Sequence, residues 1–257
     1  MSRTISEQLT IIKQQHRLGV MTHVVMGYPS LHETKQRVLA MAAAGVDSIE
    51  LQIPFSDPLA DGPAITKANQ QALAAGVTVQ QCLQLAEQLT RAVDIPLQCI
   101  GYYNTIHHFG VQQFVQASQA AGIQGFTIPD MPLTEEPYEH FYALAAQANL
   151  PVIQLISPAT PIERLRLINQ HAQAMVYCVS RFGVTGAHTT LPDHLITYLR
   201  TVRQYVTLPL AVGFGISTPK HIRALHGLAD VAVIGSALLN VSLENLTQQL
   251  TNLCAER

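Results

Sequence analysis

Tryptophan is absent from the 257 residues, aromatic residues make up only 6% of the chain, and charged residues only 12%. The 15 Lys and Arg residues nearly balance the 17 Asp and Glu residues, and no basic run or basic patch mixed with aromatic residues occurs. Because nucleic-acid recognition depends on such a patch, we expect no nucleic-acid partner. Any charge on a ligand must then be met by a few local groups.

Long apolar runs are also missing. No stretch approaches the roughly 18 consecutive apolar residues that a membrane-spanning helix needs. The first residues lack the continuous apolar segment of a secretory signal peptide. We therefore expect a cytoplasmic protein with no membrane partner.

Cysteine is scarce, with four residues and no CxxC pair, and three of the four lie in apolar stretches. This usage is typical of reduced, mostly buried thiols. His107 and His108 are adjacent and have no partners at metal-ligand spacing. We expect them to be loop residues, and we expect no metal site.

The chain is rich in short apolar runs, and 48% of its residues are hydrophobic. Runs with many Val and Ile residues alternate with longer amphipathic segments, which is the pattern of βα units around a parallel sheet. The runs cover residues 20–27, 48–53, 96–103, 125–130, 151–157, 175–180, 209–215 and 230–236. Eight apolar strands with both faces covered favour an α/β fold, a single-domain (β/α)8 TIM barrel over residues 1–257. Residues 1–17 predict an extra N-terminal helix that closes the bottom of the barrel.

Glu50 is the one charged residue in the apolar run SIELQI. Its neighbours Ile49 and Leu51 should point toward the helices, so the alternation of a strand directs Glu50 into the barrel, close to the end where active sites lie. Pairing with a buried cation is the structural alternative, but the inward positions offer no Lys or Arg. Burial disfavours a charged carboxylate, which suits a group that takes up and releases protons.

The segment after this strand, PFSDPLADGPAI, is long for a βα connection and contains Asp57 and Asp61. Asp57 precedes a proline and could serve only as a turn former. Asp61 could serve only as the N-cap of a helix that begins near Pro63. From spacing alone, structural and functional roles are equally open for both.

Glycines and hydroxyl residues follow the last three predicted strands, in SRFGVTGAH, VGFGIS and IGSA. Each glycine could serve only a tight turn. Together with a short helix that begins near Ser236, the three loops predict a phosphate site, which barrels of this kind often build there.

These motifs, in this order, resemble the tryptophan synthase α-subunit family. The resemblance rests on IELQIPFSDPLADGPAI, YYN, IPDMPLTEE, SRFGVTG, VGFGIS and IGSA, and it extends over nearly the whole chain. The combination of PFSDPLADGP with SRFGVTG is far more specific than a general phosphate-binding barrel.

The resemblance implies a carbon–carbon lyase that cleaves indole-3-glycerol phosphate to indole and glyceraldehyde 3-phosphate, by a retro-aldol step without metal or organic cofactor. Glu50 matches the catalytic glutamate of the family and Asp61 its catalytic aspartate. The chemistry assigns Glu50 to protonating indole C3 and deprotonating the hydroxyl, and Asp61 to accepting the indole N–H.

Further positions match residues around the substrate. The phosphate-binding matches are Gly186, Gly215, Gly235 and Ser236, with Phe214 between two glycines of that site. Ile100, Tyr177 and either Phe126 or Thr127 are expected to shape the indole slot. Tyr102 and Thr185 match polar positions near the reacting centre, where Thr185 could hold Asp61 when the loop closes.

The resemblance also implies a β-subunit partner in an α2β2 assembly. The matching surface residues are Asp57, Pro58, Asn104 and Pro132. Three alternatives remain open: a stand-alone lyase that releases indole, another phosphate-binding barrel such as an isomerase, and a non-catalytic activator of a β subunit. The presence of both carboxylates argues against the last.

The chain departs from the family pattern at three positions. Gln52 stands where the family usually has glycine and should also face inward. His23 stands where a larger apolar or aromatic residue is usual; it could line the indole slot or be a hydrogen-bonded core histidine, which we favour. Phe182 replaces a small residue within SRxGVTG.

Overall fold

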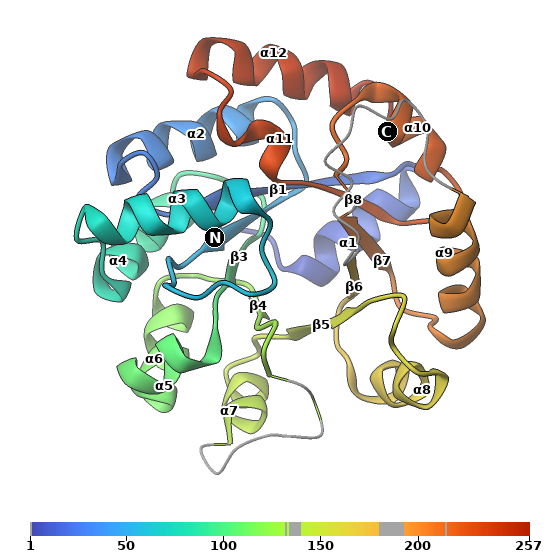
Figure 1. Ribbon diagram of the computed structural model, residues 1–257, viewed down its shortest axis with the longest axis horizontal. Helices are drawn as coiled ribbons and strands as arrows, with labels where there is room; N and C mark the ends of the chain where they lie inside the picture. Colours follow the sequence, from blue (N-terminus) through green and yellow to red (C-terminus); the bar gives the residue numbers. More distant parts are fainter. Residues whose placement is uncertain (1, 132, 134–139, 180–192, 214) are drawn as a thin grey trace.

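The structure is a computed structural model that describes residues 2–131, 133, 140–179, 193–213 and 215–257. Its strands form one closed parallel barrel in chain order, because β1 pairs with both β2 and β8 (Figure 1). The strands are β1 Gly19–Val25, β2 Ser48–Gln52, β3 Leu97–Ile100, β4 Phe126–Thr127, β5 Val152–Ile156, β6 Val176–Val179, β7 Leu210–Gly213 and β8 Val231–Ile234. All eight predicted strands are confirmed, and so is the TIM barrel.

Helices surround the barrel and cover the outer face of its strands (Figure 1). They are α1 Ile5–Gln14, α2 Leu31–Ala43, α3 Pro63–Ala74, α4 Val79–Thr90, α5 Tyr103–Phe109, α6 Val111–Ala120, α7 Phe141–Gln147, α8 Ile162–His171, α9 Asp193–Tyr205, α10 Pro219–Leu225, α11 Ser236–Leu239 and α12 Leu243–Cys254. The outward side chains of the strands and the inward side chains of these helices form one large apolar core. Such double coverage requires strands that are apolar on both faces.

Local sequence signals set the limits of several helices. Thr4 and Thr78 form capping boxes at the starts of α1 and α4, which satisfy backbone N–H groups that lack a partner within the helix. Gly45 follows α2 with a φ of +90°, a left-handed conformation that glycine adopts without strain. The chain then turns directly into β2.

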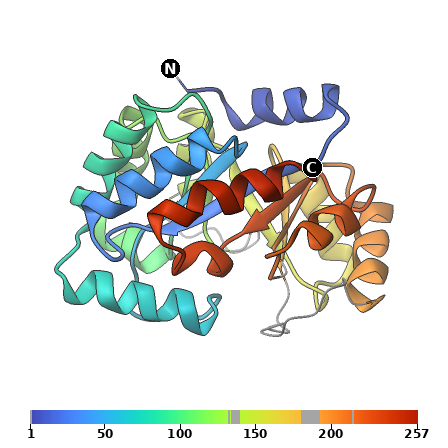
Figure 2. The ribbon, with the colours of Figure 1, turned by 90° about the horizontal axis from the view of Figure 1, so that it is seen from above.

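The predicted N-terminal helix is confirmed as α1, which lies across one end of the barrel (Figure 2). Ile5 of α1 belongs to the same buried cluster as Met21, Met175 and Val231 from the barrel strands. Apolar side chains thus fill the barrel near the N-terminal ends of its strands. The open space remains at the opposite end, where the strands terminate.

Asp47 ties α1 to the barrel immediately before β2. The carboxylate is buried and accepts hydrogen bonds from Arg17 (2.7 Å), from the side-chain amide of Gln8 (2.8 Å) and from the backbone N–H of Val20 (2.9 Å). Arg257, at the other end of the chain, lies 3.2 Å from the same carboxylate. One side chain therefore joins both chain ends to β1 and β2.

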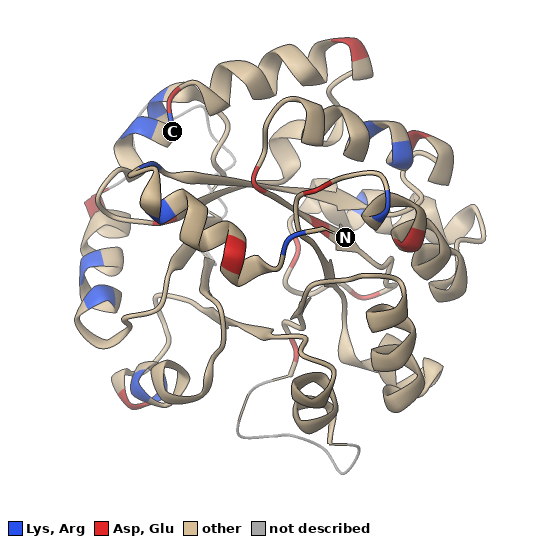
Figure 3. Cartoon of the chain, turned by 180° about the vertical axis from the view of Figure 1, so that it is seen from behind, with Lys and Arg blue, Asp and Glu red and all other residues tan. Residues whose placement is uncertain are grey.

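Charged residues of both signs lie on the surrounding helices and their connections (Figure 3). Among the helices described, none is long and apolar enough to span a membrane. Cys82, Cys99, Cys178 and Cys254 are free thiols, and the first three are buried, as the sequence predicted.

Two local predictions were wrong. His107 and His108 belong to α5 and not to a loop. The predicted third and fourth strands are also too long, since β3 ends at Ile100 and β4 contains only Phe126 and Thr127. The chain leaves the sheet early because α5 begins at Tyr103 and because Pro129 has no N–H for a ladder hydrogen bond.

We predict that Asp47→Ala destabilises the protein strongly, because it leaves Arg17 and Gln8 without their acceptor. Loss of one partner of a buried ion pair costs about 3 kcal/mol or more, which lowers the melting temperature of a domain of this size by roughly 6–12 °C. Asp94→Ala is the control, because the Asp94 side chain is exposed. Equal melting temperatures for the two variants in thermal unfolding would contradict the role of Asp47.

Candidate active site

A cavity lies at the C-terminal ends of the barrel strands, where TIM barrels carry their active sites. Side chains and backbone from β1, β3, β6, β7 and β8 line it, together with the segment after β2. Its residues include His23, Asp61, Ile100, Tyr177, Gly213, Gly215, Gly235 and Ser236. An adjoining cavity, lined by Tyr102 and Asp130, shares Ala60, Asp61 and Gly62 with the first.

Glu50 is completely buried inside the barrel next to this cavity, although it does not line it. One carboxylate oxygen, Oε1, accepts hydrogen bonds from the side chains of Gln98 (2.9 Å) and Thr127 (3.2 Å). Ile49 and Leu51 point outward into the core beneath the helices. The predicted inward orientation of Glu50 is therefore confirmed.

The second oxygen of Glu50, Oε2, faces a histidine. His23 stands directly opposite Glu50 in the β1–β2 register, and its Nδ1 lies 3.5 Å from Oε2. This separation is long for a hydrogen bond but short for a charge contact. The sequence indicated no Lys or Arg near Glu50, and the neighbouring basic group proves to be an imidazole.

Gln52 extends this contact to Asp61. Its amide oxygen lies 2.9 Å from His23 Nε2, and its amide nitrogen donates to Asp61 Oδ2 at 2.7 Å. Both His23 and Gln52 are buried. The four side chains of Glu50, His23, Gln52 and Asp61 thus form a continuous polar chain from the barrel interior to the loop, which we call the acid–base chain.

Burial and charge act in opposite directions on the pKa values of the acid–base chain. Burial lowers the pKa of His23, but the adjacent Glu50 carboxylate, followed by Asp61 and Gln52, more than compensates and raises it. Burial raises the pKa of Asp61, and His23, Gln52 and Tyr102 offset this only in part. Asp61 therefore accepts protons more readily than an exposed aspartate.

The loop at 54–63 is attached to the barrel by several contacts. Tyr102 accepts a hydrogen bond from the backbone N–H of Ala60 (3.0 Å), and its hydroxyl lies 3.4 Å from Asp61 Oδ2. The rings of Tyr102 and Phe55 stack at 4.9 Å. The N-cap of α3 is Gly62, so the structural alternative for Asp61 as an N-cap is wrong. Its carboxylate faces the cavity instead.

Tyr177 forms part of the cavity wall because Gly213 makes room for it. A Cβ atom on Gly213 would come within 2.8 Å of the Tyr177 ring. Burial, followed by the charges of Glu50 and Asp61, raises the pKa of the Tyr177 phenol well above its usual value. Tyr177 therefore stays uncharged and offers the cavity an aromatic surface.

The structure brings most of the sequence-predicted substrate residues together. Ile100, Tyr177, Gly215, Gly235 and Ser236 line the main cavity with Asp61, and Tyr102 lines the adjoining one. Thr127 is fully buried and contacts Glu50 instead of lining a cavity. Thr185, Gly186 and Phe214, as well as the departure at Phe182, lie outside the described residues.

Phe126 and Thr127, the two alternatives for the indole slot, point to opposite sides of β4, and neither lines the cavity. Phe126 packs outward against Phe114 and Phe141, with ring centroids 5.6 and 5.5 Å away. Thr127 points into the barrel toward Glu50. Thr127 is therefore a residue that orients Glu50.

The predicted partner residues differ in exposure. Asp57 and Asn104 are exposed, Pro58 is buried, and Pro132 lies outside the described residues. Leu59, next to Pro58, is 94% exposed and carries the apolar surface of this loop. An apolar groove lined by Pro54, Phe55, Leu73 and Asn104 adjoins the same region.

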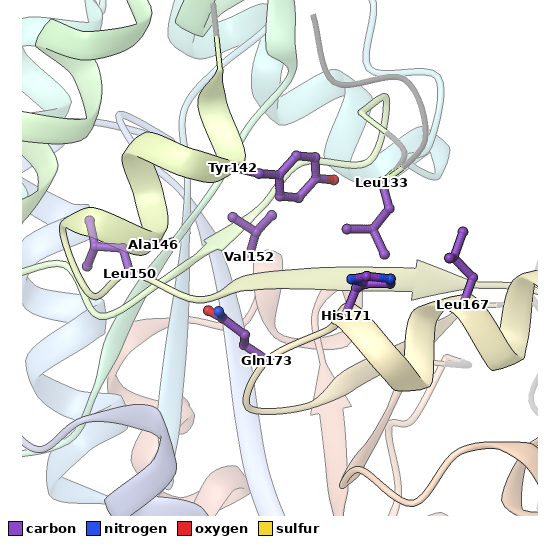
Figure 4. A pocket seen from close by; sticks show the side chains of 8 residues that line it. All are labelled: Leu133, Tyr142, Ala146, Leu150, Val152, Leu167, His171 and Gln173. Carbon is purple, nitrogen blue, oxygen red and sulfur yellow. The ribbon is translucent and has the colours of Figure 1, made fainter.

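Another cavity lies outside the barrel, between α7, β5 and α8 (Figure 4). Tyr142, His171 and Gln173 contribute its polar groups, and none of the described residues that line it carries a carboxylate. Within the described part of the chain, no group of three His, Cys, Asp or Glu residues could hold a metal ion. The cavity beside Glu50, by contrast, is lined by a carboxylate, Asp61, and a basic side chain, His23.

Sequence reasoning missed the contacts made by His23 and Gln98. His23 is buried and hydrogen-bonded, as expected of a core histidine, yet it also lines the cavity and faces Glu50. Gln98 faces Glu50 across the β2–β3 pair. Polar residues at inward positions of two neighbouring strands were the available signal.

Comparisons with known proteins point to a single family. A family model described as "Tryptophan synthase alpha chain" matches residues 9–256. A tryptophan synthase alpha chain from Desulfotalea psychrophila is 41% identical over 242 residues, which cover 94% of both chains. Its counterpart from Desulforapulum autotrophicum is 43% identical over 229 residues, with 89% and 90% of the two chains covered.

Solved structures are similar over the same extent. The fold matches a structure of Mycobacterium tuberculosis tryptophan synthase with a TM-score of 0.91 and 26% identity, covering 100% of this chain and 98% of the other. The matched region includes all strands of the barrel.

We predict that Tyr102→Phe loosens the loop at 54–63, because the Ala60 N–H loses its acceptor. Loss of one such hydrogen bond, about 1 kcal/mol, should accelerate amide exchange at Ala60 about fivefold. Tyr28→Phe is the control, since the Tyr28 hydroxyl contacts only Asn240 among the side chains described. Unchanged hydrogen–deuterium exchange at Ala60 in Tyr102→Phe would show that this bond does not hold the loop.

Proposed function

This chain belongs to the tryptophan synthase alpha chain family, and from that premise we propose that Glu50 and Asp61 perform the family's reaction. The reaction is the retro-aldol cleavage of indole-3-glycerol phosphate to indole and glyceraldehyde 3-phosphate, so the protein is a carbon–carbon lyase. The observation that carries the residue assignment is the pair of carboxylates at the C-terminal end of the barrel, Glu50 fully buried and Asp61 half-buried, joined through His23 and Gln52.

Asp61 serves the indole ring. Its carboxylate lines the cavity and its pKa is raised, chiefly by burial. It accepts the indole N–H as the ring becomes an indolenine, and its negative charge stabilises the positive charge that develops there. Ile100 and Tyr177 supply the apolar walls that hold the ring.

Glu50 exchanges the two protons of the reaction. It delivers one to indole C3, which weakens the bond to the glycerol chain, and it removes one from the adjacent hydroxyl. Because Glu50 lies beside the cavity and does not line it, its side chain rotates toward the cavity when the substrate binds. Oε2 makes no hydrogen bond to any described residue, so this rotation breaks the two hydrogen bonds at Oε1 and changes the 3.5 Å charge contact between Oε2 and His23.

The phosphate belongs at the other side of the cavity. Gly215, Gly235 and Ser236 line that wall at the ends of β7 and β8, where backbone groups can approach an anion closely. Gly215 has a φ of +67°, a conformation that favours glycine. Gly186 and Thr185 match further positions of this site from outside the described residues.

The partner is a tryptophan synthase β subunit, as in the α2β2 assembly of the family. We assign its contact to the outer side of the loop at 54–63, near Asp57, Pro58 and Asn104. Pro132, which lies outside the described residues, matches a further partner position of the family. Support comes from Leu59, which is 94% exposed, together with the apolar groove of Pro54, Phe55 and Leu73 in the same region, because a continuous exposed apolar surface marks an interaction site.

We also infer one catalytic domain and a cytoplasmic location. All the strands described belong to one closed sheet. The substrate is a phosphorylated metabolite, which does not cross membranes unaided. The reaction proposed for Glu50 and Asp61 uses side chains alone.

We predict that Glu50→Gln lowers the rate of indole-3-glycerol phosphate cleavage by roughly 10² or more, because the amide cannot exchange protons. The fold should persist, since an amide oxygen can still accept from Gln98 and Thr127. Steady-state release of indole measures the rate, and thermal unfolding measures the fold.

Glu163→Gln is the matched control, because Glu163 is exposed on α8. It should keep the parent rate. A Glu50→Gln protein that retains most of its turnover would refute the assignment of Glu50.

We predict that a β subunit accelerates the cleavage, because contact with the loop at 54–63 favours the conformation in which Asp61 faces the cavity. A tenfold increase at saturation requires a bias of only about 1.4 kcal/mol. The measurement is a titration of β subunit into a fixed amount of this chain, with indole release as the readout.

Leu59→Ser should weaken this activation, whereas Leu39→Ser, a partly exposed leucine on α2, should not. High activity of the chain alone, with no increase at saturating β subunit, would favour the stand-alone lyase. A chain inactive under all conditions that still stimulates the β subunit would favour the non-catalytic activator.

A further inference from the structure

The contacts of the acid–base chain determine where its protons lie. Asp61, Gln52, His23 and Glu50 are linked in that order by separations of 2.7, 2.9 and 3.5 Å. We propose that His23 holds the proton that Glu50 delivers to the substrate, and that Gln52 fixes the ring of His23 for this purpose while it ties Asp61 to the barrel. His23 acts through Glu50 and is therefore a positioning residue.

The orientation of the Gln52 amide fixes one proton on His23. The Asp61 carboxylate can only accept, so the nitrogen of the Gln52 amide must point toward it, at 2.7 Å. The amide oxygen then faces His23 Nε2 at 2.9 Å. An oxygen acceptor requires a donor, so Nε2 carries a hydrogen.

The second nitrogen of His23 then requires another proton. Nδ1 faces Glu50 Oε2 at 3.5 Å, and Oε2 makes no hydrogen bond to any other described residue. With Nε2 already protonated, a neutral imidazole would direct the lone pair of Nδ1 at a carboxylate oxygen. A proton between Nδ1 of His23 and Oε2 of Glu50 removes this repulsion. His23 is then an imidazolium cation that faces the Glu50 carboxylate.

The charges around His23 favour the same arrangement. Glu50 and Asp61 contribute two carboxylates from β2 and the loop after it, and among the described residues that line the cavity His23 is the one basic side chain. Among the described residues of the two cavities, the other titratable groups are the carboxylate of Asp130 and the phenols of Tyr177 on β6 and Tyr102 after β3, and burial raises the pKa of both phenols. Gln98 on β3 is uncharged, and β8 contributes Val233. The raised pKa of His23 agrees with this balance.

The pair of His23 and Glu50 accounts for both protons that the reaction transfers. The Nδ1 proton of His23 passes to Glu50 Oε2, and Glu50 delivers it to indole C3. The carbon–carbon bond breaks, and its electron pair returns to the indole ring. The hydroxyl proton passes to Glu50 as the carbonyl forms and then returns to His23. One proton is delivered and one recovered, so no external proton is consumed.

This inference rests on the proposed roles of Glu50 and Asp61, and it concerns the two positions where the chain departs from the usual pattern of the family it resembles. The family usually has a larger apolar or aromatic residue at position 23 and glycine at position 52. Neither can form the bridge between the two carboxylates. Proton storage by an imidazole is therefore a property of this chain and not of the reaction.

The direct test is a nitrogen-15 NMR titration of the histidine side chains in the unliganded protein. His23 is assigned from the signal missing in His23→Phe, or from the signal that moves in Gln52→Met if the first variant does not fold. We expect both ring nitrogens of His23 to be protonated at pH 7, with a pKa above the usual value of about 6.5. The exposed His32 provides an internal reference.

Two variants separate the contacts. Glu50→Gln should lower the pKa of His23, because the facing charge is lost, and Gln52→Met should lower it as well. Gln154→Met is the matched control, because Gln154 is a buried amide on β5 that contacts Tyr142 and not His23. A His23 that is neutral at pH 7 in the parent protein, or whose titration is the same in Glu50→Gln, overturns the proposal.

The pH dependence of turnover gives a second readout that a purely structural role would not move. The stored proton is lost as the pH rises through the raised pKa of His23, so the rate should fall on the alkaline side. A lone glutamic acid, with a usual pKa of about 4.3, holds its proton less well than an imidazole–carboxylate pair. In His23→Phe the fall should therefore move to lower pH by about two units, the difference between the usual pKa values of imidazole and glutamic acid, which is about a hundredfold at a fixed alkaline pH.

An unchanged pH profile in a folded His23→Phe protein also overturns the proposal. The two hypotheses fail separately. Full turnover in Glu50→Gln refutes the proposed function, whereas the protonation of His23 in the parent protein is measured by NMR independently of turnover. An inactive Glu50→Gln protein combined with a neutral His23 refutes only the storage of the proton.

Discussion

The site depends on one constraint, the burial of the Glu50 carboxylate inside the barrel. A carboxylate removed from water costs several kcal/mol unless hydrogen bonds and an opposite charge compensate. Gln98 and Thr127 supply two donors to one oxygen, and His23 faces the other. The inward-facing polar residues of β1, β3 and β4 are therefore those that stabilise the buried carboxylate of Glu50. Since the N-terminal half of the barrel is filled with apolar side chains and closed by α1, this polar group can occupy only the C-terminal end.

Three residues of the acid–base chain lie on strands, and the fourth lies on a loop. Glu50, His23 and Gln52 lie on neighbouring strands whose register is fixed by backbone hydrogen bonds, so their mutual positions are well defined. Asp61 lies on a loop and is held by the side chains of Gln52 and Tyr102. The same loop presents Leu59 on its outer side. A partner that binds there can influence Asp61 without touching the barrel, which gives a physical route from subunit contact to catalysis.

The sequence predicted the barrel because its strands are apolar on both faces, and it predicted the orientation of Glu50 because side chains alternate along a strand. It did not predict that His23 faces Glu50, since that contact depends on the register between two strands more than twenty residues apart. The choice between Phe126 and Thr127 needed the position of β4 in the closed sheet. The role of Asp61 was equally undetermined, because an aspartate before Gly-Pro is as suitable for an N-cap as for catalysis. Gly62 proves to be the N-cap, and tertiary contacts with Gln52 and Tyr102 hold Asp61 at the cavity.

The central claim is that Glu50 and Asp61 act on the two reacting atoms of the indole ring. The most direct measurement is a crystal structure of this protein with an analogue that keeps the indole ring and the phosphate but lacks the hydroxyl needed for cleavage. The account predicts the indole nitrogen within hydrogen-bond distance of Asp61, C3 nearest to Glu50 and His23, and the phosphate against Gly215, Gly235 and Ser236. An analogue bound with its ring away from both carboxylates, or with its phosphate at another wall of the cavity, would contradict it.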